Sequence, residues 1–154
     1  MRIALGADHA GVALKADIKR LLLDRGLDVI DLGTDSTDPV DYPDIAVRVG
    51  EEVGSGRADQ GILLCGSGIG MAMAANKLAG VRAAPVTDED SARLSREHND
   101  ANVLALGART TPLDLARRIV ELFLDTPFGG GRHRRRVDKI NGLDARPDFA
   151  SRKD

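Results

Sequence analysis

The chain has 154 residues, of which 42% are hydrophobic and 30% charged, the proportions of a soluble globular protein. Its net charge of −2 excludes the overall basic field that drives nonspecific nucleic-acid binding. Apolar runs fall far short of the roughly 20 residues that a membrane span needs, and the N-terminus lacks a signal-peptide pattern. The single cysteine, Cys65, cannot form an internal disulfide. We therefore expect a cytoplasmic protein with neither a nucleic-acid nor a membrane partner.

The first part of the chain predicts a strand, a helix and a second strand. Residues 2–7 form a short apolar run that stops at the polar pair Asp8-His9, as a buried strand does. Four apolar residues then recur with the spacing of one helical face: Leu14, Ile18, Leu21 and Leu22. Residues 27–32 predict the second strand. Residues 33–43, rich in Asp, Thr, Ser and Pro, predict a loop.

The middle of the chain repeats this alternation around a glycine-rich turn. Residues 44–53 predict a helix and residues 61–65 a buried strand. The segment 66–70, Gly-Ser-Gly-Ile-Gly, leads into an Ala-rich stretch, residues 71–78, that favours a helix. Residues 81–86 predict the fourth strand.

The last part predicts two more α/β steps and a basic C-terminal segment. Helix-start residues at 87–90 predict a helix to about Glu97, which would place His98 and Asn99 in a loop before a fifth strand at 103–106. Thr111-Pro112 predicts the start of a helix that ends before Pro127. A final helix is expected from Arg132 to about Leu143.

Strands that alternate with helices through short loops imply a parallel sheet covered on both faces. We therefore predict an α/β fold, a three-layer α/β/α sandwich with a five-stranded parallel sheet, in one domain over residues 1–143. Residues 144–154 are expected to form a frayed C-terminal tail.

Ligands of open parallel sheets bind beyond the carboxyl ends of the strands. Polar residues follow several of the predicted strands, and His98 and Asn99 lie just before the fifth. We read them together as one site: Asp8, His9, Cys65, Ser67, Thr87, Asp88, His98, Asn99 and Arg109. Asp8 could orient His9 or a substrate hydroxyl, or cap the first helix. His9 and His98 suit acid–base or phosphate-binding roles, or are surface or capping residues. Their spacing is not that of the usual metal ligands, so we expect no metal site.

The glycine-rich turn is the strongest local signal. Gly66, Gly68 and Gly70 would let backbone N–H groups approach a phosphate or an oxyanion, although a tight turn without a ligand is the alternative. A dinucleotide site is a weaker interpretation: Asp88 lies where a ribose-binding acid is expected, but Met71 occupies the third glycine position of that motif.

Cys65, between a strand and a helix N-terminus, could act as a base or nucleophile, or be a small buried hydrophobic residue. Ser67 could shuttle a proton or only serve the turn. Tyr42, in the 33–43 loop, could stack on or hydrogen-bond to a ligand, or simply pack there. Arg132 and Arg136 would share one helical face and suit a phosphate, whereas a solvated face or a nucleic-acid contact are the alternatives. Aromatic residues make up only 3% of the chain, which disfavours base stacking.

Six motifs in order resemble the ribose-5-phosphate isomerase type B and galactose-6-phosphate isomerase family. They span nearly the whole chain: Gly6-Ala-Asp-His-Ala-Gly11, Asp41-Tyr-Pro43, Cys65-Gly-Ser-Gly-Ile-Gly70, Ala75-Asn-Lys77, Ser95-Arg-Glu-His-Asn99 and Gly131-Arg-His-Arg-Arg-Arg136. The resemblance implies a Rossmann-like domain and a homodimer with active sites at the subunit interface, and leaves open whether dimers pair into tetramers. It also implies interconversion of an aldose phosphate and a ketose phosphate without a cofactor or metal.

The resemblance further implies roles for individual residues. Cys65 would remove the C1 or C2 proton to give a cis-enediolate, Ser67 would move a proton between O1 and O2, and His98 would open the sugar ring. Some relatives use instead a glutamate after the glycine loop; Met71 stands there in this chain.

The substrate-binding residues implied by the resemblance fall into three groups. They are a phosphate set of His9, Arg109, Arg132 and Arg136, a hydroxyl set of Asp8 and Asn99, and an oxyanion set of N–H groups at Gly66, Gly68 and Gly70. Ribose 5-phosphate is the expected substrate; a tetrose or hexose phosphate is the alternative, with loop 33–43 as a candidate selector of substrate length.

Overall fold

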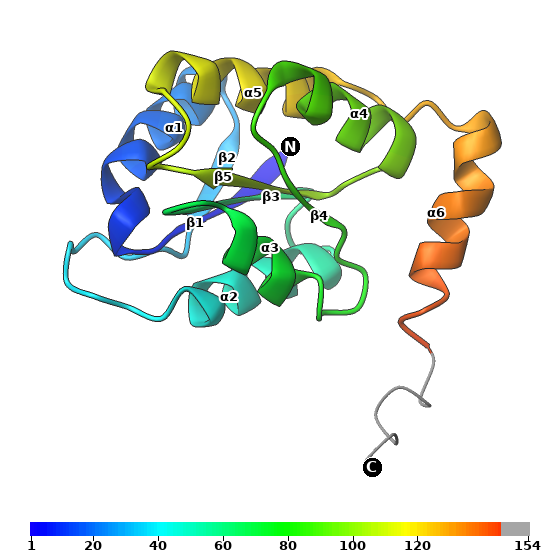
Figure 1. Cartoon of the computed structure of the whole chain (residues 1–154), viewed down its shortest axis with the longest axis horizontal. Helices are drawn as coiled ribbons and strands as arrows, with labels where there is room; N and C mark the ends of the chain where they lie inside the picture. The colour runs from blue at the N-terminus through cyan, green and yellow to red at the C-terminus, as the bar shows by residue number, and fades with distance from the viewer. Residues whose placement is uncertain (146–154) are drawn as a thin grey trace, which may run out of the picture.

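The structure is a computed structural model, and it describes residues 1–145. Five strands alternate with helices along the chain (Figure 1). The strands are β1 (Arg2–Ala7), β2 (Asp28–Asp31), β3 (Gln60–Cys65), β4 (Ala83–Pro85) and β5 (Val103–Gly107). The helices are α1 (Val12–Asp24), α2 (Tyr42–Gly54), α3 (Ile69–Ala75), α4 (Glu89–Asn99), α5 (Leu113–Asp125) and α6 (Arg134–Asn141), with 3₁₀ turns at His9–Gly11 and Gly131–His133.

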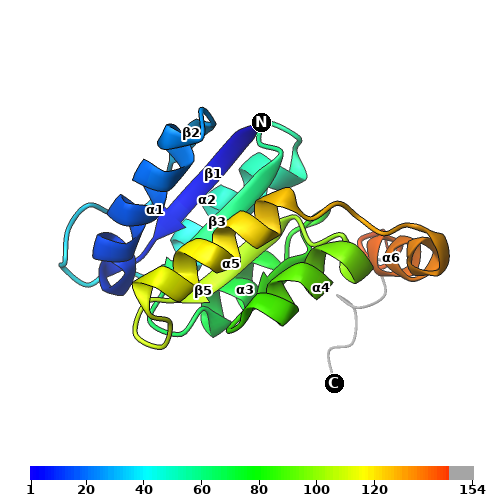
Figure 2. The ribbon, with the colours of Figure 1, turned by 90° about the horizontal axis from the view of Figure 1, so that it is seen from above.

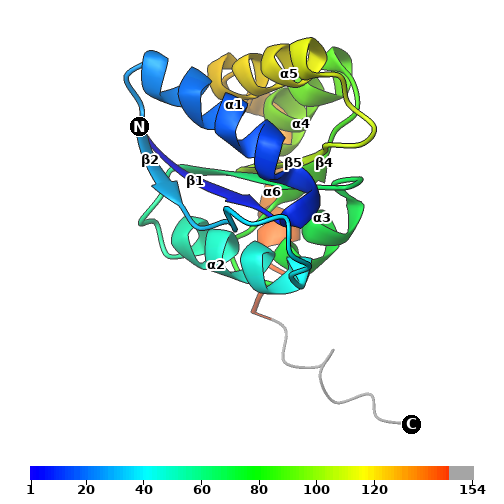
Figure 3. The same cartoon turned by 90° about the vertical axis from the view of Figure 1, so that its left-hand side faces the viewer.

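The five strands form one parallel sheet in the order β2-β1-β3-β5-β4. Helices α1, α4 and α5 cover one face and α2 and α3 the other, which gives the three layers seen in Figure 3. The predicted α/β/α sandwich with five parallel strands is therefore confirmed. The expected domain boundary at residue 143 stays a prediction, and of the expected tail only residues 144 and 145 lie within the described part of the chain.

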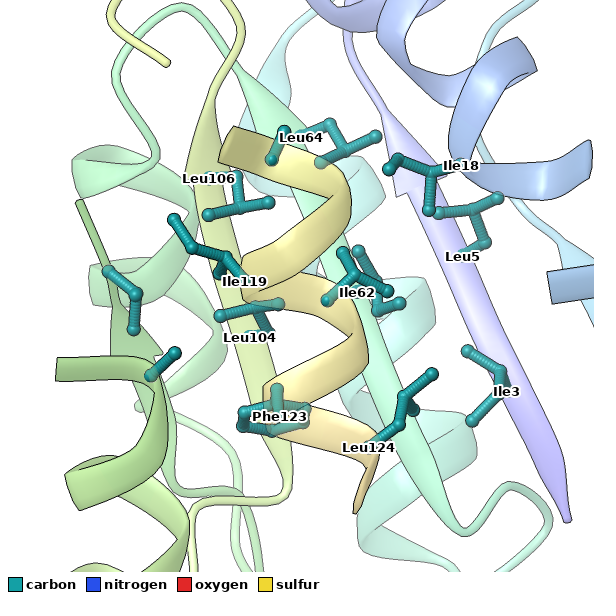
Figure 4. Close-up of a cluster of buried hydrophobic side chains, with 14 of the residues drawn as sticks. Ile3, Leu5, Ile18, Ile62, Leu64, Leu104, Leu106, Ile119, Phe123 and Leu124 are labelled. Atoms are coloured by element: carbon teal, nitrogen blue, oxygen red, sulfur yellow. The ribbon is translucent and has the colours of Figure 1, made fainter. Parts of the chain in front are cut away.

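Each face of the sheet buries its own apolar cluster. On one face, strand residues such as Leu5, Ile62 and Leu104 pack against Ile119 and Phe123 of α5, all fully buried (Figure 4). On the other, Val49 of α2 and Met71 of α3 are equally buried against the sheet. Strands buried on both faces read as continuous apolar runs, which is why the sequence pattern identified them.

The strand order reverses its direction between β1 and β3. From β1 the chain moves outward to β2, and from β3 it moves the other way, first to the edge strand β4 and then back to β5. The two loops that leave neighbouring strands in opposite directions open a crevice at their carboxyl ends, and this is where open α/β sheets bind ligands. Asp8 and His9 leave β1 there, and Gly66 leaves β3.

Helix α6 stands beside the layered body, beyond α4 (Figure 2). Arg82 Nη1, just before β4, donates to Asn141 Oδ1 over 2.9 Å, and the Gly80 N–H donates to Asp144 Oδ2 over 2.8 Å. The side chain of Val137 is buried, while Arg132 and Arg136 are exposed. The C-terminal end of α6 is thus attached to the body, and its basic N-terminal end faces solvent.

Several element boundaries differ from the sequence prediction. Helix α2 begins at Tyr42, so Tyr42 is helical rather than part of the loop, because Pro43 suits the first turn of a helix. Helix α4 continues through His98 and Asn99 and stops at Asp100, whose φ is +46°, so the expected loop position of these two residues is wrong. Helix α3 begins two residues early and ends at Ala75. Arg132 lies in a 3₁₀ turn ahead of α6.

Candidate active site

The β1–β3 crevice brings together the polar residues that follow these two strands. The Asp8 N–H donates to the Leu64 carbonyl over 3.1 Å, which joins the ends of β1 and β3. The Asp8 side chain is buried, and its Oδ1 accepts a hydrogen bond from the Ala10 N–H over 2.9 Å. This bond caps the 3₁₀ turn that contains His9, so Asp8 fixes the direction in which His9 leaves the strand.

Cys65 ends β3 at the carboxyl edge of the sheet and is buried. The Gly68 N–H donates to Cys65 Sγ over 3.1 Å, and the Ser67 Oγ accepts from the Ile69 N–H over 3.3 Å. A backbone N–H directed at sulfur stabilises negative charge there, as does the adjacent N-terminus of α3. Cys65 therefore has the surroundings of a base, and the exposed Ser67 hydroxyl lies two residues away.

Close packing makes glycine necessary in the loop after β3. Gly68 has φ +78°, and a Cβ there would lie 2.9 Å from the carbonyl carbon of Leu106 in β5. A Cβ on Gly66 would lie 3.0 Å from Arg109 Nη1. The backbone of the loop thus packs against β5. Arg109 lies beside the loop, and its backbone N–H donates to the Gly66 carbonyl over 3.1 Å.

Tyr42 closes the crevice from α2. A Cβ on Gly70 would lie 2.6 Å from the Tyr42 ring, so the ring lies directly on the backbone of the first turn of α3. The tyrosine remains 41% exposed. N–H groups in the first turn of a helix have no carbonyl partner within that helix, so Tyr42 flanks donors that an anionic ligand can use.

His9 is half-buried at the same end of the sheet. Its Nδ1 accepts a hydrogen bond from the Val40 N–H over 3.3 Å, at the end of the loop that follows β2. Nδ1 is therefore an acceptor, and the proton of the neutral ring lies on Nε2. Nε2 is left as a donor, which suits a phosphate oxygen.

The other predicted residues gather at the opposite edge of the sheet. His98 and Asn99 end α4, where Arg82 donates to the Asp100 carbonyl and the Asn102 carbonyl accepts from the Gly61 N–H at the start of β3. The rings of His98 and His133 stack with centroids 4.2 Å apart and planes at 12°. Arg136 Nη1 donates to the Arg132 carbonyl over 3.4 Å, so both arginines lie on the α6 side of this stack.

The expectation that all these side chains share one edge of the sheet is therefore wrong within one chain. A helix that follows a parallel strand returns the chain to the amino edge, and α4, with 11 residues, is about 16 Å long. His98 and Asn99 lie at its far end. Asp8, His9, Cys65 and Arg109 form a carboxyl-edge cluster, and His98, Asn99, Arg132 and Arg136 form an amino-edge cluster.

His133 lies in the amino-edge cluster through its stack on His98, although its sequence position alone did not mark it as a candidate. Loss of solvent around the ring lowers its pKa below the usual value, and the neighbouring His98, Arg132 and Arg136 charges lower it further. Its position one residue after Arg132, a predicted phosphate-binding residue, is the sequence signal that could have marked it. However, the stack on His98 depends on how α6 sits against α4, which periodicity does not reveal.

A cavity of about 420 Å³ lies between α6 and the body at the amino edge. Its lining is mixed, with Asn99 and Arg82 beside Ala101, Ile140 and Leu143. Asn99 is thus accessible from this cavity.

Asp88, the candidate ribose-binding acid, has a structural role instead. Its Oδ1 accepts from the Ser91 N–H over 2.7 Å, and this bond lowers the pKa of the carboxyl. It is the N-cap of α4. The carboxylate is engaged in capping, which weakens the dinucleotide interpretation.

The fold and the residues at the strand ends define a class: a Rossmann-like α/β protein with a buried cysteine and a glycine-rich loop at the topological switch point. A model of the Ribose/Galactose Isomerase family matches residues 3–140. Ribose-5-phosphate isomerase B of Escherichia coli is 48% identical over 145 residues, 94% of this chain and 97% of that protein. D-erythrulose-4-phosphate isomerase of Pectobacterium atrosepticum is 44% identical over 142 residues, 91% of this chain and 93% of that protein.

Among solved structures, ribose-5-phosphate isomerase B of Clostridium thermocellum superposes with a TM-score of 0.92 at 51% identity, covering 94% of this chain and 97% of that one. This chain therefore belongs to the ribose/galactose isomerase family, whose members interconvert aldose and ketose forms of phosphorylated sugars. In residues 1–145 no helix is long and apolar enough to span a membrane.

Proposed function

We propose that this protein interconverts ribose 5-phosphate and ribulose 5-phosphate through a cis-enediolate, with Cys65 as the base. The observation that carries the proposal is the Gly68 N–H bond to a buried cysteine sulfur at the β1–β3 crevice. The family relationship supports the reaction class, and two relatives named ribose-5-phosphate isomerase B support the sugar.

The proposed reaction moves one hydrogen between neighbouring carbons. After ring opening, the Cys65 thiolate takes the C2 proton of the aldose, and the bond electrons form the C1–C2 double bond of the enediolate. Ser67 transfers a proton from O2 to O1, and Cys65 returns its proton to C1, which leaves the carbonyl at C2. The N–H groups of Gly66 and Gly70 stabilise the oxyanion, a contribution of roughly 3 kcal/mol per donor at such sites. The Gly68 N–H, the third donor expected from the sequence, is engaged with Cys65 Sγ instead.

The phosphate and the sugar ring need the amino-edge cluster as well. We propose that Arg132 and Arg136 bind the phosphate with His9 and Arg109, that His98 opens the ring, and that Asp8 and Asn99 bind hydroxyls. Tyr42 flanks the bound sugar. The two clusters lie on opposite edges of a sheet whose central strand β3 has six residues, a length of about 20 Å. One chain therefore cannot bring both to a single small sugar.

A homodimer resolves this separation, because the partner's amino edge can complete the crevice. Ile69 and Met73 are 52% and 65% exposed, four residues apart on α3, and Tyr42 lies next to them. Exposed apolar side chains beside an incomplete site are typical of a subunit interface. The other copy would supply His98, Asn99, Arg132 and Arg136.

Isomerisation of a tetrose phosphate is the second candidate, because a relative named D-erythrulose-4-phosphate isomerase is 44% identical. The loop after β2 leads into Tyr42, and its Val40 N–H contacts His9. The length of this loop is therefore a reasonable determinant of the length of the sugar that the site accepts. A hexose phosphate is the remaining sugar alternative, and a nucleotide-binding role is weaker because Asp88 caps a helix.

The reaction as proposed uses no cofactor, and a reduced Cys65 fits a cytoplasmic location. Residues 1–143 would form the isomerase domain.

Turnover of ribose 5-phosphate by the purified protein in EDTA tests this proposal. We expect conversion to ribulose 5-phosphate, and kcat/KM for ribose 5-phosphate above that for erythrose, allose and galactose phosphates. A higher kcat/KM for a tetrose or hexose phosphate would keep the chemistry and change the substrate. No turnover of any of these sugars would contradict the proposal.

A further inference from the structure

A buried lysine lies behind the loop that follows β2. Lys15 of α1 has a side chain only 3% exposed, and its Nζ donates to Asp31 Oδ1 over 2.9 Å and to Asp35 Oδ1 over 2.6 Å. Lys19, one turn later on α1, donates to the other oxygen of Asp31 over 2.9 Å. The catalytic scheme above uses none of these charges.

The ion pairs keep both buried partners charged. Burial lowers the pKa of Lys15, but the hydrogen bonds to Asp35 and Asp31 outweigh it, and the net pKa is raised. Burial raises the pKa of Asp31, but bonds from Lys15, Lys19 and the Gly33 N–H outweigh it, and the net pKa is lowered. A buried ammonium held in this way is a fixed point to which a loop can be attached.

The attached loop runs from Leu32 to Asp41. At its start the Thr34 N–H donates to the Ala7 carbonyl over 3.0 Å. A Cβ on Gly33 would collide with the Ala7 backbone, so the loop passes directly over the end of β1. Asp35 follows in the loop, and its side chain, which is 90% exposed, forms the ion pair with Lys15.

The far end of the same loop contacts His9. The Val40 N–H donates to His9 Nδ1 over 3.3 Å, and this bond selects the tautomer whose proton lies on Nε2. The loop thus has two attachments: the Lys15–Asp35 ion pair near its start and the Val40–His9 hydrogen bond near its end. Displacement of the first would shift the second.

We propose that Lys15 is a positioning residue: through Asp35 it fixes the loop whose Val40 N–H orients His9 as an Nε2–H donor to the substrate phosphate. The proposal rests on the proposed function in one respect, the phosphate contact of His9. Its structural part, control of the His9 tautomer by the Lys15–Asp35 pair, is independent of turnover.

Asp35→Asn is the sharpest test, because it removes the charge of the loop attachment at an exposed residue, leaving at most a neutral acceptor for Lys15 Nζ, and keeps the Lys15–Asp31 and Lys19–Asp31 pairs in place. Asp38→Asn is the matched control: it removes the same charge from the same exposed loop. We expect Asp35→Asn to raise KM for ribose 5-phosphate about five- to tenfold with kcat within about twofold, the scale of coupling between adjacent sites. The inhibition constant of inorganic phosphate should rise by the same factor, and Asp38→Asn should change neither.

Two further measurements separate this role from a general effect on stability. In a His9→Ala background, Asp35→Asn should raise KM no further, because the Lys15–Asp35 pair acts on phosphate binding only through His9. Nitrogen-15 NMR of the imidazole should show one Nε2–H tautomer in the parent protein and a tautomer mixture in Asp35→Asn.

An unchanged KM, or the same rise in KM with and without His9, would overturn the proposal. If His9 kept the same single tautomer in Asp35→Asn, the proposal would also be overturned, even if the parent protein turned over none of the sugars. Lys15→Met should reproduce the Asp35→Asn changes with a larger loss of stability, and a soluble Lys15→Met protein with parental KM would also contradict the assignment.

Discussion

The two edges of the sheet carry chemically different clusters. At the carboxyl edge, the proposed base is a buried side chain held by the backbone: Cys65 Sγ accepts a hydrogen bond from the Gly68 N–H, and Gly68 is fixed by its positive φ against β5. At the amino edge, Arg132 and Arg136 are exposed side chains in the 3₁₀ turn and first helical turn of α6, which stands beside the body. Proton abstraction requires the first kind of site, preorganised and shielded from water. Capture of a charged group suits the second.

The difference also concerns how each cluster is supported. The residues of the carboxyl-edge cluster follow β1, β3 and β5, which are adjacent central strands. Because these strands are part of the core, the cluster cannot move without it. The amino-edge cluster depends on the ends of α4 and α6, which are joined by the His98–His133 stack and by a Gly129 N–H bond to the Glu97 carbonyl of 2.9 Å. Substitutions at Cys65 and in the glycine loop should therefore act mainly on kcat, and those at Arg132 and Arg136 mainly on KM.

The largest expected effect is that of Cys65→Ala. Loss of a general base costs about 10²–10⁴-fold in rate, so we expect kcat to fall by about 10³-fold with KM little changed. Because Ala is smaller than Cys in a buried position, thermal unfolding should be recorded in parallel. Loss of hydrogen exchange between substrate C2 and solvent, followed by NMR, checks that proton abstraction is the missing step. Turnover at the parental rate would exclude Cys65 as the base.

Arg136→Ala should produce the next largest effect. A charge-assisted hydrogen bond to an ionised group contributes about 1.5–3 kcal/mol, so KM should rise by about 10- to 100-fold, with a smaller change in kcat. Arg135→Ala is the matched control, since it removes an equal charge from the neighbouring exposed position. If the two variants had equal KM values, the phosphate assignment would be wrong and α6 would contribute only general charge.

Gly68→Ala tests the packing of the loop on β5. The added methyl group meets both a φ of +78° and the Leu106 backbone at 2.9 Å, and we expect a loss of about 2–3 kcal/mol in the free energy of unfolding, together with reduced kcat. Gly56→Ala is the control: its φ is +75°, but nothing lies within 4 Å of the added Cβ. It should cost about 1 kcal/mol and leave kcat unchanged. Urea titration measures both, and equal losses would show that the close packing is unimportant.

The smallest effect should be a pH dependence at the His98–His133 stack. The pKa of His133 is lowered in the folded state, so the folded protein binds fewer protons there than the unfolded chain as the pH falls through about 6.5. Stability should therefore decline on acidification through that window and be complete above it. His133→Gln should lose this part of the decline. Thermal unfolding between pH 7.5 and 5.5 compares the two, and parallel curves would contradict the assigned shift.

Much of the carboxyl edge could be predicted from the sequence, because its residues follow strands directly. The apolar runs that end at Asp8 and Cys65 locate both residues without knowledge of tertiary structure. His98 could not be placed in this way. Periodicity ended α4 near Glu97, whereas the helix continues until Asp100 adopts a left-handed conformation. Either way, a residue between a helix and the next parallel strand lies at the amino edge, so the position of His98 before β5, and not the length of α4, sets its distance from Cys65.

Lys15 was missed for a related reason. It stands next to Leu14 on an amphipathic helix, where lysine normally reaches solvent. Its burial depends on Asp31 and Asp35, which come from another strand and loop. Tertiary ion pairs of this kind leave no periodic signal in the sequence.

The most direct test of the central claim, that one site combines the two edges of two subunits, is complementation between inactive variants. Cys65→Ala and an Arg132→Ala, Arg136→Ala double variant would be co-expressed with different tags, and the mixed dimers purified through both tags. A mixed dimer with shared sites holds one intact site of two, so we expect about half of the parental activity per dimer. Mixed dimers no more active than their inactive parents would contradict the account.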